Sequence, residues 1–330
     1  MNYPLADNLF DDDVMLEPIR AGFGRGLKKA GEKNDQIVAL CADLTESTQM
    51  HLFRDAFPER FIEVGIAEQN LVTVASGLAR AGKIPFTSSY AAFSPGRNWE
   101  QIRTTIALNN QPVKIVGSHA GVSVGPDGAT HQMLEDIALM RVLPNMVVIA
   151  PGDSVEAEKA TLAMAEHNTP CYLRLAREKT PVFSTEASPF EIGKAYVLRE
   201  GADVGLVGTG AMSYQLLAAA EILARQGIEA RVVHVPTIKP LDETVIIETA
   251  QKTGRLVTAE EAQAAGGLGG AVAELLGEKL PVPLNRIGVR DRFGESGSPA
   301  ELMEHFRLTG ETIVEDLQDW LRDTPRYHQG

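Results

Sequence analysis

The stretch RFIEVGIAEQNLVTVASGLARAG, residues 60–82, predicts the fold class and raises a question about chemistry. Residues 60–65 have the apolar content of a buried strand, and residues 70–82 have the periodicity of a packed helix. The segment between them, GIAEQN (65–70), places the carboxylate of Glu68 in the first turn of that helix. A helix dipole favours a negative charge there by about 0.3–1 kcal/mol. A structural role and a chemical role for Glu68 are therefore both open.

The alternation of a short apolar run with a helical pattern recurs along the chain. Near-continuous apolar runs are typical of strands that are covered on both faces, as in parallel sheets. The pattern therefore predicts an α/β fold with mostly parallel, doubly wound sheets. The predicted strands of the first half are QIVALCADL (36–44), RFIEVG (60–65), IPFTSSY (84–90), VKIVGSHA (113–120), NMVVIAP (145–151) and CYLRLAR (171–177).

A break in this pattern predicts two domains. The segment EKTPVFSTEASPFEI (178–192) lacks periodicity and is rich in Pro, Ser and charge, which is typical of a linker. After it, the alternation resumes with VGLVGTGA (204–211), a helical pattern at 212–227, EARVVHVPTIKPLD (229–242) and GRLVTAEEA (254–262). We expect one domain over residues 1–182, a linker at 183–192 and a second domain over residues 193–330.

Composition narrows the class of protein. The chain has 330 residues, 44% of them hydrophobic and 23% charged, and a net charge of −13. An acidic chain repels phosphate backbones, so we expect no nucleic-acid partner. No apolar run approaches the roughly 20 residues of a membrane span, and the N-terminus carries an acidic cluster where a signal peptide would be basic. We expect a cytoplasmic protein with no membrane contact, in which Cys41 and Cys171 are buried core residues.

Polar and aromatic side chains follow the ends of the predicted strands. Ligands of parallel α/β sheets bind beyond the carboxyl ends of the strands. Each residue also has a structural interpretation, such as a solvated histidine, a turn glycine or a core aromatic, and Ser94 followed by Pro95 has the residue types of a helix start. Taken together they predict a site. The residues are Asp43, Thr45, Ser47, Glu68, Tyr90, Phe93, His119, the loop AGVSVGPDGATHQ (120–132) and Arg177.

These segments resemble a known family. GIAEQN, TSSYAAF (87–93), SHAGVSVGPDGATHQ (118–132) and LRLAR (173–177) resemble the pyrimidine-binding domain of transketolases, over about residues 20–177. TAEEAQAAGGLGGAVAELL (258–276) resembles the transketolase C-terminal domain. The glycines at 266–271 lack the full G-x-G-x-x-G spacing of a dinucleotide site. The resemblance implies instead that this second domain is structural and supports a dimer.

The resemblance implies a thiamine-diphosphate enzyme and assigns roles around the cofactor. The residue that matches Glu68 touches ring nitrogen N1′ of the aminopyrimidine and is catalytic. A carboxylate in an apolar setting has a raised pKa and can share a proton with such a ring. Tyr90 and Phe93 match aromatics that flank the ring, and Asp43 matches a carboxylate near the thiazolium. The family often has a third aromatic where this chain has Gly96.

The resemblance also implies a substrate site. Arg20, Ser47, His119 and Arg177 match positions that bind the sugar phosphate, for which guanidinium groups are well suited. Asp127 and His131 match positions that contact the sugar hydroxyls. His131 is a second catalytic candidate, because the ordinary pKa of histidine lies near the working pH.

One expected motif is missing. Thiamine-diphosphate enzymes bind Mg²⁺ through a GDG motif and a later Asn, whereas this chain has only GDS at 152–154. We therefore expect no metal ligand in this chain. It should be the C-terminal subunit of a split transketolase, whose N-terminal subunit supplies the diphosphate site and the Mg²⁺ ligands, with two copies of each chain. The expected activity is transfer of a two-carbon ketol unit between sugar phosphates.

Three alternatives to a transketolase subunit stay open. Two are enzymes of the same superfamily: the beta subunit of a 2-oxo-acid dehydrogenase, and a relative of deoxyxylulose-phosphate synthase. The third is a non-catalytic scaffold subunit. The combined presence of Glu68, His119, Asp127, His131 and Arg177 favours an enzyme that reads sugar phosphates.

Overall fold

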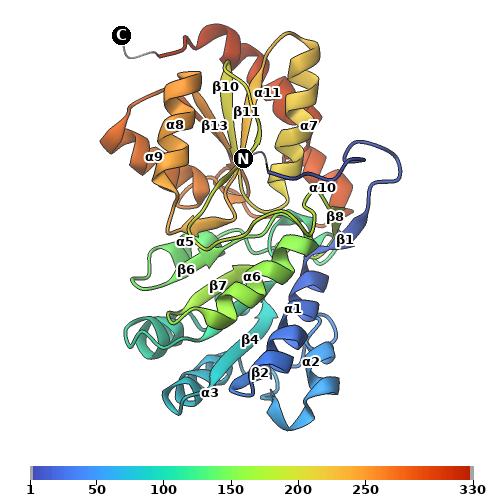
Figure 1. Ribbon diagram of the computed structural model, residues 1–330, viewed down its shortest axis with the longest axis vertical. Coiled ribbons are helices and arrows are strands. Elements are labelled where there is room, and N and C mark those ends of the chain that lie inside the picture. The colour runs from blue at the N-terminus through green and yellow to red at the C-terminus, as the bar shows by residue number, and fades with distance from the viewer. Residues whose placement is uncertain (1–2, 328–330) are drawn as a thin grey trace.

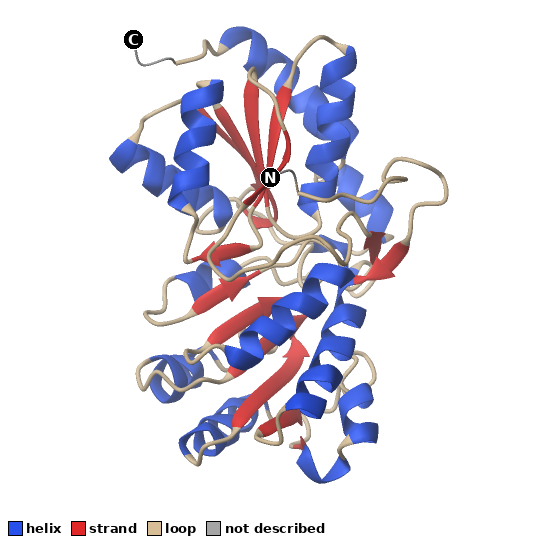
Figure 2. Ribbon diagram, in the orientation of Figure 1, coloured by secondary structure: helices blue, strands red, loops and turns tan. Residues whose placement is uncertain are grey.

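The chain forms two α/β units stacked end to end, described for residues 3–327 by a computed structural model. Figure 1 shows the first half of the chain below and the second half above. In each unit helices pack on both sides of a central sheet (Figure 2). The α/β class with mostly parallel sheets is confirmed.

The first sheet has seven strands in the order β12-β6-β7-β5-β4-β2-β3. All neighbours are parallel except β12, which runs antiparallel to β6. All six strands predicted for the first half are present, and β12 comes from the second half of the chain. The bounds are β2 Ile37–Cys41, β3 Phe61–Glu63, β4 Ile84–Tyr90, β5 Lys114–Ser118, β6 Val147–Ile149, β7 Cys171–Arg174 and β12 Thr237–Lys239.

Helices cover both faces of this sheet. One face packs against α1 (Ile19–Lys33), α2 (His51–Ala56) and α6 (Ser154–Glu166). The other packs against α3 (Glu68–Arg80), η2 (Ile102–Ala107) and α5 (Asp136–Arg141). The remaining short helical segments are η1 Pro58–Arg60, η3 Val122–Val124 and α4 Trp99–Gln101, which runs directly into η2.

One predicted helix start is wrong. Ser94 and Pro95 lie in a turn, and α4 begins only at Trp99 after its N-cap Asn98. The turn forms because the backbone amides of both Phe93 and Ser94 donate to the carbonyl of Tyr90, at 2.8 Å each. This places the segment after β4 close to the first turn of α3.

The second sheet has five strands in the order β14-β13-β10-β11-β9. Only β9 is antiparallel to its neighbour. The strands are β9 Tyr196–Arg199, β10 Val204–Gly208, β11 Ala230–His234, β13 Leu256–Gln263 and β14 Leu284–Val289. One face packs against α7 (Met212–Arg225), α10 (Pro299–His305) and α11 (Gly310–Asp323), and the other against α8 (Glu243–Thr253) and α9 (Leu268–Lys279). A separate antiparallel pair, β1 (Leu16–Pro18) and β8 (Lys179–Pro181), lies beside α1.

The two units share buried side chains. Val122 and Leu134 of the first half belong to the same apolar cluster as α7 and α11. Conversely, Ile238 and Ala262 of the second half belong to the cluster beneath α3 and α5. The first sheet thus includes β12 from the second half, and each half adds buried residues to the core of the other. The domain limits 1–182 and 193–330 stay a prediction.

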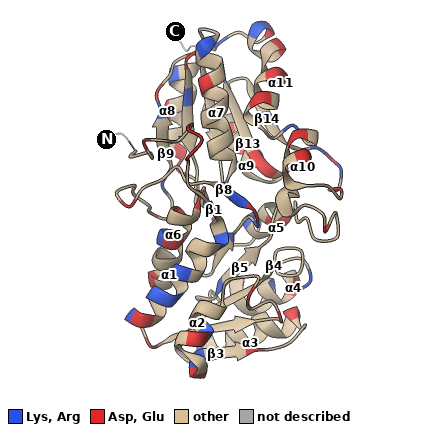
Figure 3. Cartoon of the chain, turned by 90° about the vertical axis from the view of Figure 1, so that its right-hand side faces the viewer, with Lys and Arg blue, Asp and Glu red and all other residues tan. Residues whose placement is uncertain are grey.

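Charge is concentrated on helices and loops rather than on strands, with an acidic pair on β13 as an exception (Figure 3). That pair is Glu260 and Glu261, both buried. Cys41 and Cys171 are free and buried, as predicted. Among the helices of residues 3–327, none has the length and apolar character needed to cross a membrane.

Candidate active site

Glu68 is buried at the start of α3, with 6% of its surface exposed. Its Oε1 atom accepts a hydrogen bond of 3.1 Å from Nη1 of Arg97. Its main-chain carbonyl accepts one of 2.7 Å from the Asn98 side chain, which fixes the first turn of α3 against the segment after β4. Among residues 3–327, the only side-chain partner of its carboxylate is this exposed arginine. Glu68 therefore combines burial with a partner that can move.

Four aromatic rings lie together beside this carboxylate. Tyr90 at the end of β4 stacks on His119, with ring centroids 3.8 Å apart. It also stacks on Phe93 at 5.8 Å. His131 meets the edges of both, at 5.4 Å from Phe93 and 6.3 Å from Tyr90. The structure thus brings together Tyr90, Phe93, His119 and His131, as expected for the ends of neighbouring parallel strands.

Position 96 has no room for the third aromatic of the family. A Cβ atom at Gly96 would lie 2.0 Å from the carbonyl oxygen of Ala92. The face of Phe93 is covered instead by Arg97, the residue after Gly96, whose Cζ atom lies 4.1 Å from the ring centroid. Sequence reasoning missed Arg97. Its only signal was its position one residue after the expected aromatic.

His119 is held as a neutral side chain. Burial, followed by the positive charges of Arg20 and Arg177, lowers the pKa of His119 to about 3. Its Nδ1 atom lies 2.9 Å from the hydroxyl of Ser118. A neutral imidazole can both donate and accept a hydrogen bond, so His119 is suited to orienting a polar ligand.

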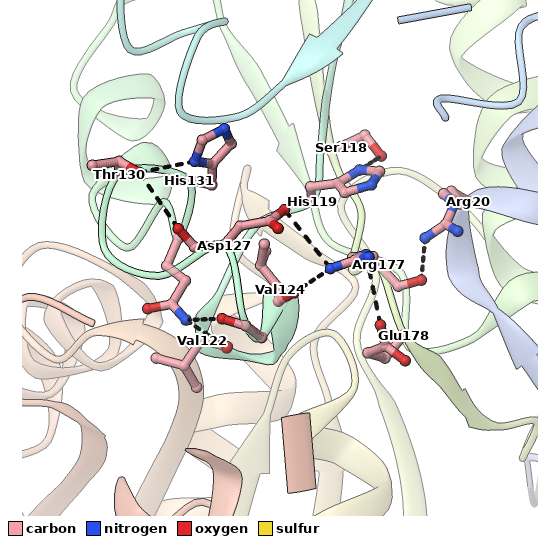
Figure 4. A network of polar contacts seen from close by, with 12 residues as sticks. Arg20, Ser118, His119, Val122, Val124, Asp127, Thr130, His131, Arg177 and Glu178 are labelled. Atoms are coloured by element: carbon pink, nitrogen blue, oxygen red, sulfur yellow. Dashed lines mark hydrogen bonds and ion pairs between the residues drawn. The ribbon is translucent and has the colours of Figure 1, made fainter. Parts of the chain in front are cut away.

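Figure 4 shows the basic side of the site. Nη1 of Arg177 donates to the carbonyl of Val124 at 2.6 Å and lies 3.8 Å from Oδ2 of Asp127. Nη1 of Arg20 donates to the main-chain carbonyl of Arg177. Burial and then the charge of Arg177 lower the pKa of Arg20. Two guanidinium groups therefore lie together. Nε of Arg20 is buried and has no hydrogen-bond partner in the described part of the chain.

The loop over residues 120–132 carries Asp127 and His131 to this cluster. The hydroxyl of Thr130 lies 2.9 Å from Nδ1 of His131 and 3.5 Å from the carbonyl of Asp127. Nδ1 is engaged in this way, so Nε2 is the ring nitrogen left to face a ligand. Asp127 is exposed, and His131 is half-buried against the aromatic rings.

Asp43 and Ser47 are not joined to the cluster. Within residues 3–327, no hydrogen bond or ion pair links either side chain to Glu68, His119 or Arg177. The turn after β2 is instead held by Glu63, whose carboxylate accepts from the amides of Asp43 (2.8 Å) and Gly65 (2.9 Å). Glu63 was also missed, because its role depends on a contact between neighbouring strands.

The glycine-rich segment at 266–271 forms the start of α9. The backbone amides of Leu268 and Gly269 each donate to the carboxylate of Glu260, at 2.8 Å. A side chain of the protein thus occupies the amides with which a dinucleotide site would bind phosphate. No group of three or more His, Cys, Asp or Glu side chains suited to a metal occurs in the described part of the chain.

Two family models match the chain. The model for the transketolase pyrimidine-binding domain matches residues 18–182, and the model for the transketolase C-terminal domain matches residues 193–313. A protein of Methanocaldococcus jannaschii, provisionally named a transketolase C-terminal section, is 44% identical over 92% of this chain and 96% of its own length. A 6-deoxy-6-sulfo-D-fructose transketolase subunit of a Clostridium species is 46% identical over 87% of this chain and 89% of its own length.

A solved structure and a longer relative complete the comparison. A split-gene transketolase, described as an inactive beta4 tetramer, superposes with a TM-score of 0.87 at 45% identity, covering 93% of this chain and 99% of that one. A 1-deoxy-D-xylulose-5-phosphate synthase of Trichormus variabilis is 40% identical over 89% of this chain but only 47% of its own length. The chain therefore belongs to the transketolase family, within which it corresponds to the C-terminal subunit of a split transketolase.

Proposed function

We propose that this chain is the C-terminal half of a two-chain transketolase. It would transfer a two-carbon ketol unit from a ketose phosphate to an aldose phosphate, with thiamine diphosphate as cofactor. One observation carries the proposal. The buried carboxylate of Glu68 is bonded to Arg97, whose guanidinium lies on the face of Phe93. Phe93 belongs to the group of stacked rings, and the charges of Arg20 and Arg177 act on another ring of that group, His119.

The residues around Glu68 fit the aminopyrimidine of thiamine diphosphate. The guanidinium of Arg97 is planar, lies on the face of Phe93 and donates a hydrogen bond to Glu68. A flat, nitrogen-bearing ring could make the same two contacts in its place. The bound cofactor would supply the carbanion chemistry that protein side chains lack. Glu68 would hold a proton at Oε1 against ring nitrogen N1′, and Tyr90 and Phe93 would orient the ring. Asp43 stays a proposal as a residue near the thiazolium.

The basic side of the site fits a sugar phosphate. Arg20 and Arg177 raise the positive potential at one point, which a phosphate dianion would neutralise through charge-assisted hydrogen bonds. His119 would add a hydrogen bond as a neutral imidazole, and Ser47 is proposed to contribute a further one. Asp127 and His131 would contact the sugar hydroxyls, and Nε2 of His131 would accept or return a proton during cleavage and addition.

The partner is proposed to be an N-terminal transketolase subunit that carries the diphosphate site and the Mg²⁺ ligands. A partner at the site would cover Ile66, which lies two residues before Glu68 and has 74% of its surface exposed. Self-association of this chain is supported by the similar split-gene protein, which is described as an inactive beta4 tetramer. An assembly with two copies of each subunit is our proposal for the active complex.

The donor sugar has two chemical candidates. Pentose phosphates are the default for the family resemblance. The Clostridium relative acts, by its name, on a sugar that carries a sulfonate. Sulfonate and phosphate both offer three anionic or polar oxygens to guanidinium groups, so Arg20 and Arg177 are compatible with either donor.

The test is a ketol-transfer assay on the native complex. The chain is purified from its source with its bound partner, and thiamine diphosphate and Mg²⁺ are added. Xylulose 5-phosphate and 6-deoxy-6-sulfo-D-fructose are offered as donors in separate reactions, with ribose 5-phosphate as acceptor, and sedoheptulose 7-phosphate is measured. The chain alone is the matched control.

Product from the complex and not from the chain alone would support a shared site, and the faster donor would identify the substrate. Product from the chain alone would overturn the partner requirement. No transfer by a cofactor-loaded complex would overturn the transketolase proposal. Formation of deoxyxylulose 5-phosphate from pyruvate and glyceraldehyde 3-phosphate would then assign the synthase reaction instead.

A further inference from the structure

The loop of residues 121–132 is attached to both halves of the molecule. It leaves β5 and returns at Met133, where the amide of Gly121 donates to the Met133 carbonyl at 2.9 Å. Between these points it carries Asp127 and His131, and its Val124 carbonyl accepts the hydrogen bond from Arg177. The position of this loop therefore sets three of the polar groups in the candidate site.

The second half of the chain contacts this loop through Glu261 of β13. Oε1 of Glu261 accepts a hydrogen bond of 2.7 Å from the backbone amide of Ser123. Glu261 also approaches Gly121 too closely to allow a side chain there, since a Cβ atom at Gly121 would lie 2.2 Å from Oε1 of Glu261. Gly121 also has a φ of +92°, which glycine adopts without strain.

A second contact lies at the other end of the loop. Nε2 of Gln132 donates to the carbonyl of Glu295 in the second half, at 2.8 Å. The same nitrogen lies 3.2 Å from the carbonyl of Val122 and 3.0 Å from that of Gly125. Gln132 therefore connects the loop, at Val122 and Gly125, to the segment before α10.

Glu261 is itself fixed in place. Its main-chain carbonyl accepts a hydrogen bond of 2.7 Å from Nη2 of Arg174 on β7. Arg174 is buried and is held by Asp136, with 2.9 Å between Nε and Oδ2. Glu261 has 4% of its surface exposed, and burial raises the pKa of its carboxyl group. Such a buried, tethered acceptor holds its donor more rigidly than a surface residue would.

We propose that Glu261 is a positioning residue for the site: through Ser123 it fixes the loop that presents Asp127 and His131 and orients Arg177. The second half of the chain thereby contributes to substrate recognition without touching the substrate. The kinetic part of this inference rests on the proposed function, whereas the structural part does not.

The experiment compares three variants of the full chain in its native complex. Glu261→Met keeps the side-chain length and removes the acceptor. Glu261→Gln keeps an amide oxygen that can accept from Ser123, and is the conservative rescue. Glu260→Met is the matched control, because Glu260 is the adjacent buried carboxylate and its hydrogen bonds go to α9.

The first readout is hydrogen exchange of the backbone amides of residues 121–132. We expect Glu261→Met to speed exchange at Ser123 and its neighbours by roughly 10-fold or more, since a hydrogen bond to a charged group is lost. Glu261→Gln should restore most of the protection, and Glu260→Met should leave the loop unchanged. Equal loop exchange in Glu261→Met and Glu260→Met would overturn the proposal.

The second readout separates binding from chemistry. Glu261→Met should raise KM for the sugar donor by roughly 10-fold, with a smaller effect on kcat and unchanged affinity for thiamine diphosphate. A lower cofactor affinity with unchanged KM would overturn the assignment to substrate recognition. If the wild-type complex shows no ketol transfer, the proposed function fails, but the exchange readout still decides whether Glu261 positions the loop.

A second variant covers the case in which Glu261→Met does not fold. Gln132→Met removes the hydrogen bond to the Glu295 carbonyl from the loop side, with little change in volume. It should speed exchange in the same loop and leave α9 protected. Normal exchange across residues 121–132 in a folded Gln132→Met variant would show that the contact with Glu295 does not hold the loop.

Discussion

Two short segments of this chain, GIAEQN (65–70) and TAEEAQ (258–263), look alike in sequence and behave differently in the structure. Both bury glutamate: Glu68 is the first residue of α3, and Glu260 and Glu261 lie on β13, the strand before α9. Among residues 3–327, the carboxylate of Glu68 has one side-chain partner, the exposed Arg97. The carboxylates of Glu260 and Glu261 accept instead from backbone amides of Leu268, Gly269 and Ser123.

The kind of hydrogen-bond donor, a backbone amide or a mobile side chain, distinguishes a structural carboxylate from one that can bind a ligand. A backbone amide is fixed by the fold, so a carboxylate bound to it has its hydrogen bonds satisfied permanently. An exposed arginine can rotate away and leave the carboxylate to a ligand. Burial alone does not make this distinction, because all three glutamates are almost fully buried.

The substitution Glu68→Gln is the strongest test of the difference between Glu68 and the two glutamates of β13. We expect turnover of the cofactor-loaded complex to fall by about 10²–10⁴, which is typical of losing a group that holds a proton during reaction. Stability should change little, because an amide can accept the same hydrogen bond from Arg97. Steady-state kinetics and denaturant unfolding would be measured on the same preparation. Turnover within threefold of wild type would remove Glu68 from the mechanism.

Glu260→Met should show the opposite pattern. Removing this carboxylate leaves two amides at the start of α9 without their acceptor, at a cost of about 1–3 kcal/mol in the free energy of unfolding. Turnover per assembled complex should stay unchanged. A stability within 0.5 kcal/mol of wild type, on the scale of a typical surface substitution, would show that these contacts contribute little.

Glu260 also predicts a dependence of stability on pH. Burial raises the pKa of its carboxyl group from 4.5 to about 7. Between these values the folded state keeps a proton that the unfolded state has lost, so the contribution is complete below pH 4.5 and is lost as pH rises to 7. The slope from one group is at most about 1.4 kcal/mol per pH unit. Unfolding midpoints measured from pH 4.5 to 7.5 should fall less steeply in Glu260→Gln, and parallel profiles would contradict the assignment.

Arg97→Ala tests the smallest expected effect. In the wild type, the ion pair of Arg97 with Glu68 and its contact with Phe93 together contribute about 1 kcal/mol. Both must break before a flat ligand can lie on the face of Phe93. We expect thiamine diphosphate to bind the native complex a few-fold more tightly in the variant, as measured by titration calorimetry. Arg103→Ala, at an exposed arginine of η2, is the control. Weaker binding in Arg97→Ala would mean that the arginine supports the cofactor.

The six strands of the first half and the start of α3 near Glu68 were predictable because each depends on local apolar pattern. The meeting of Tyr90, His119 and Arg177 was predictable as well, since parallel strands end at one edge of a sheet. Neither the contact of Arg97 with Phe93 nor that of Glu261 with Ser123 was predicted. The first depends on a crowded backbone at Gly96, and the second on a contact between residues 138 positions apart.

The helix expected at Pro95 illustrates how a local rule fails. Ser followed by Pro suits a helix start, but the two amides donated to the Tyr90 carbonyl form a turn first. Asp43 and Ser47 illustrate the opposite limit. Their positions after β2 suggested membership of the site, yet over residues 3–327 no hydrogen bond or ion pair joins either side chain to Glu68, His119 or Arg177. Their proposed roles depend on a ligand and stay predictions.

The strand β12 has a consequence for the modularity of the chain. It is three residues long, belongs by sequence to the second half, and completes the edge of the first sheet beside β6. A fragment cut at the linker would leave β6 as an open, apolar edge, which is a template for aggregation. Protein engineering that cuts the chain at residue 192 would therefore divide a shared sheet.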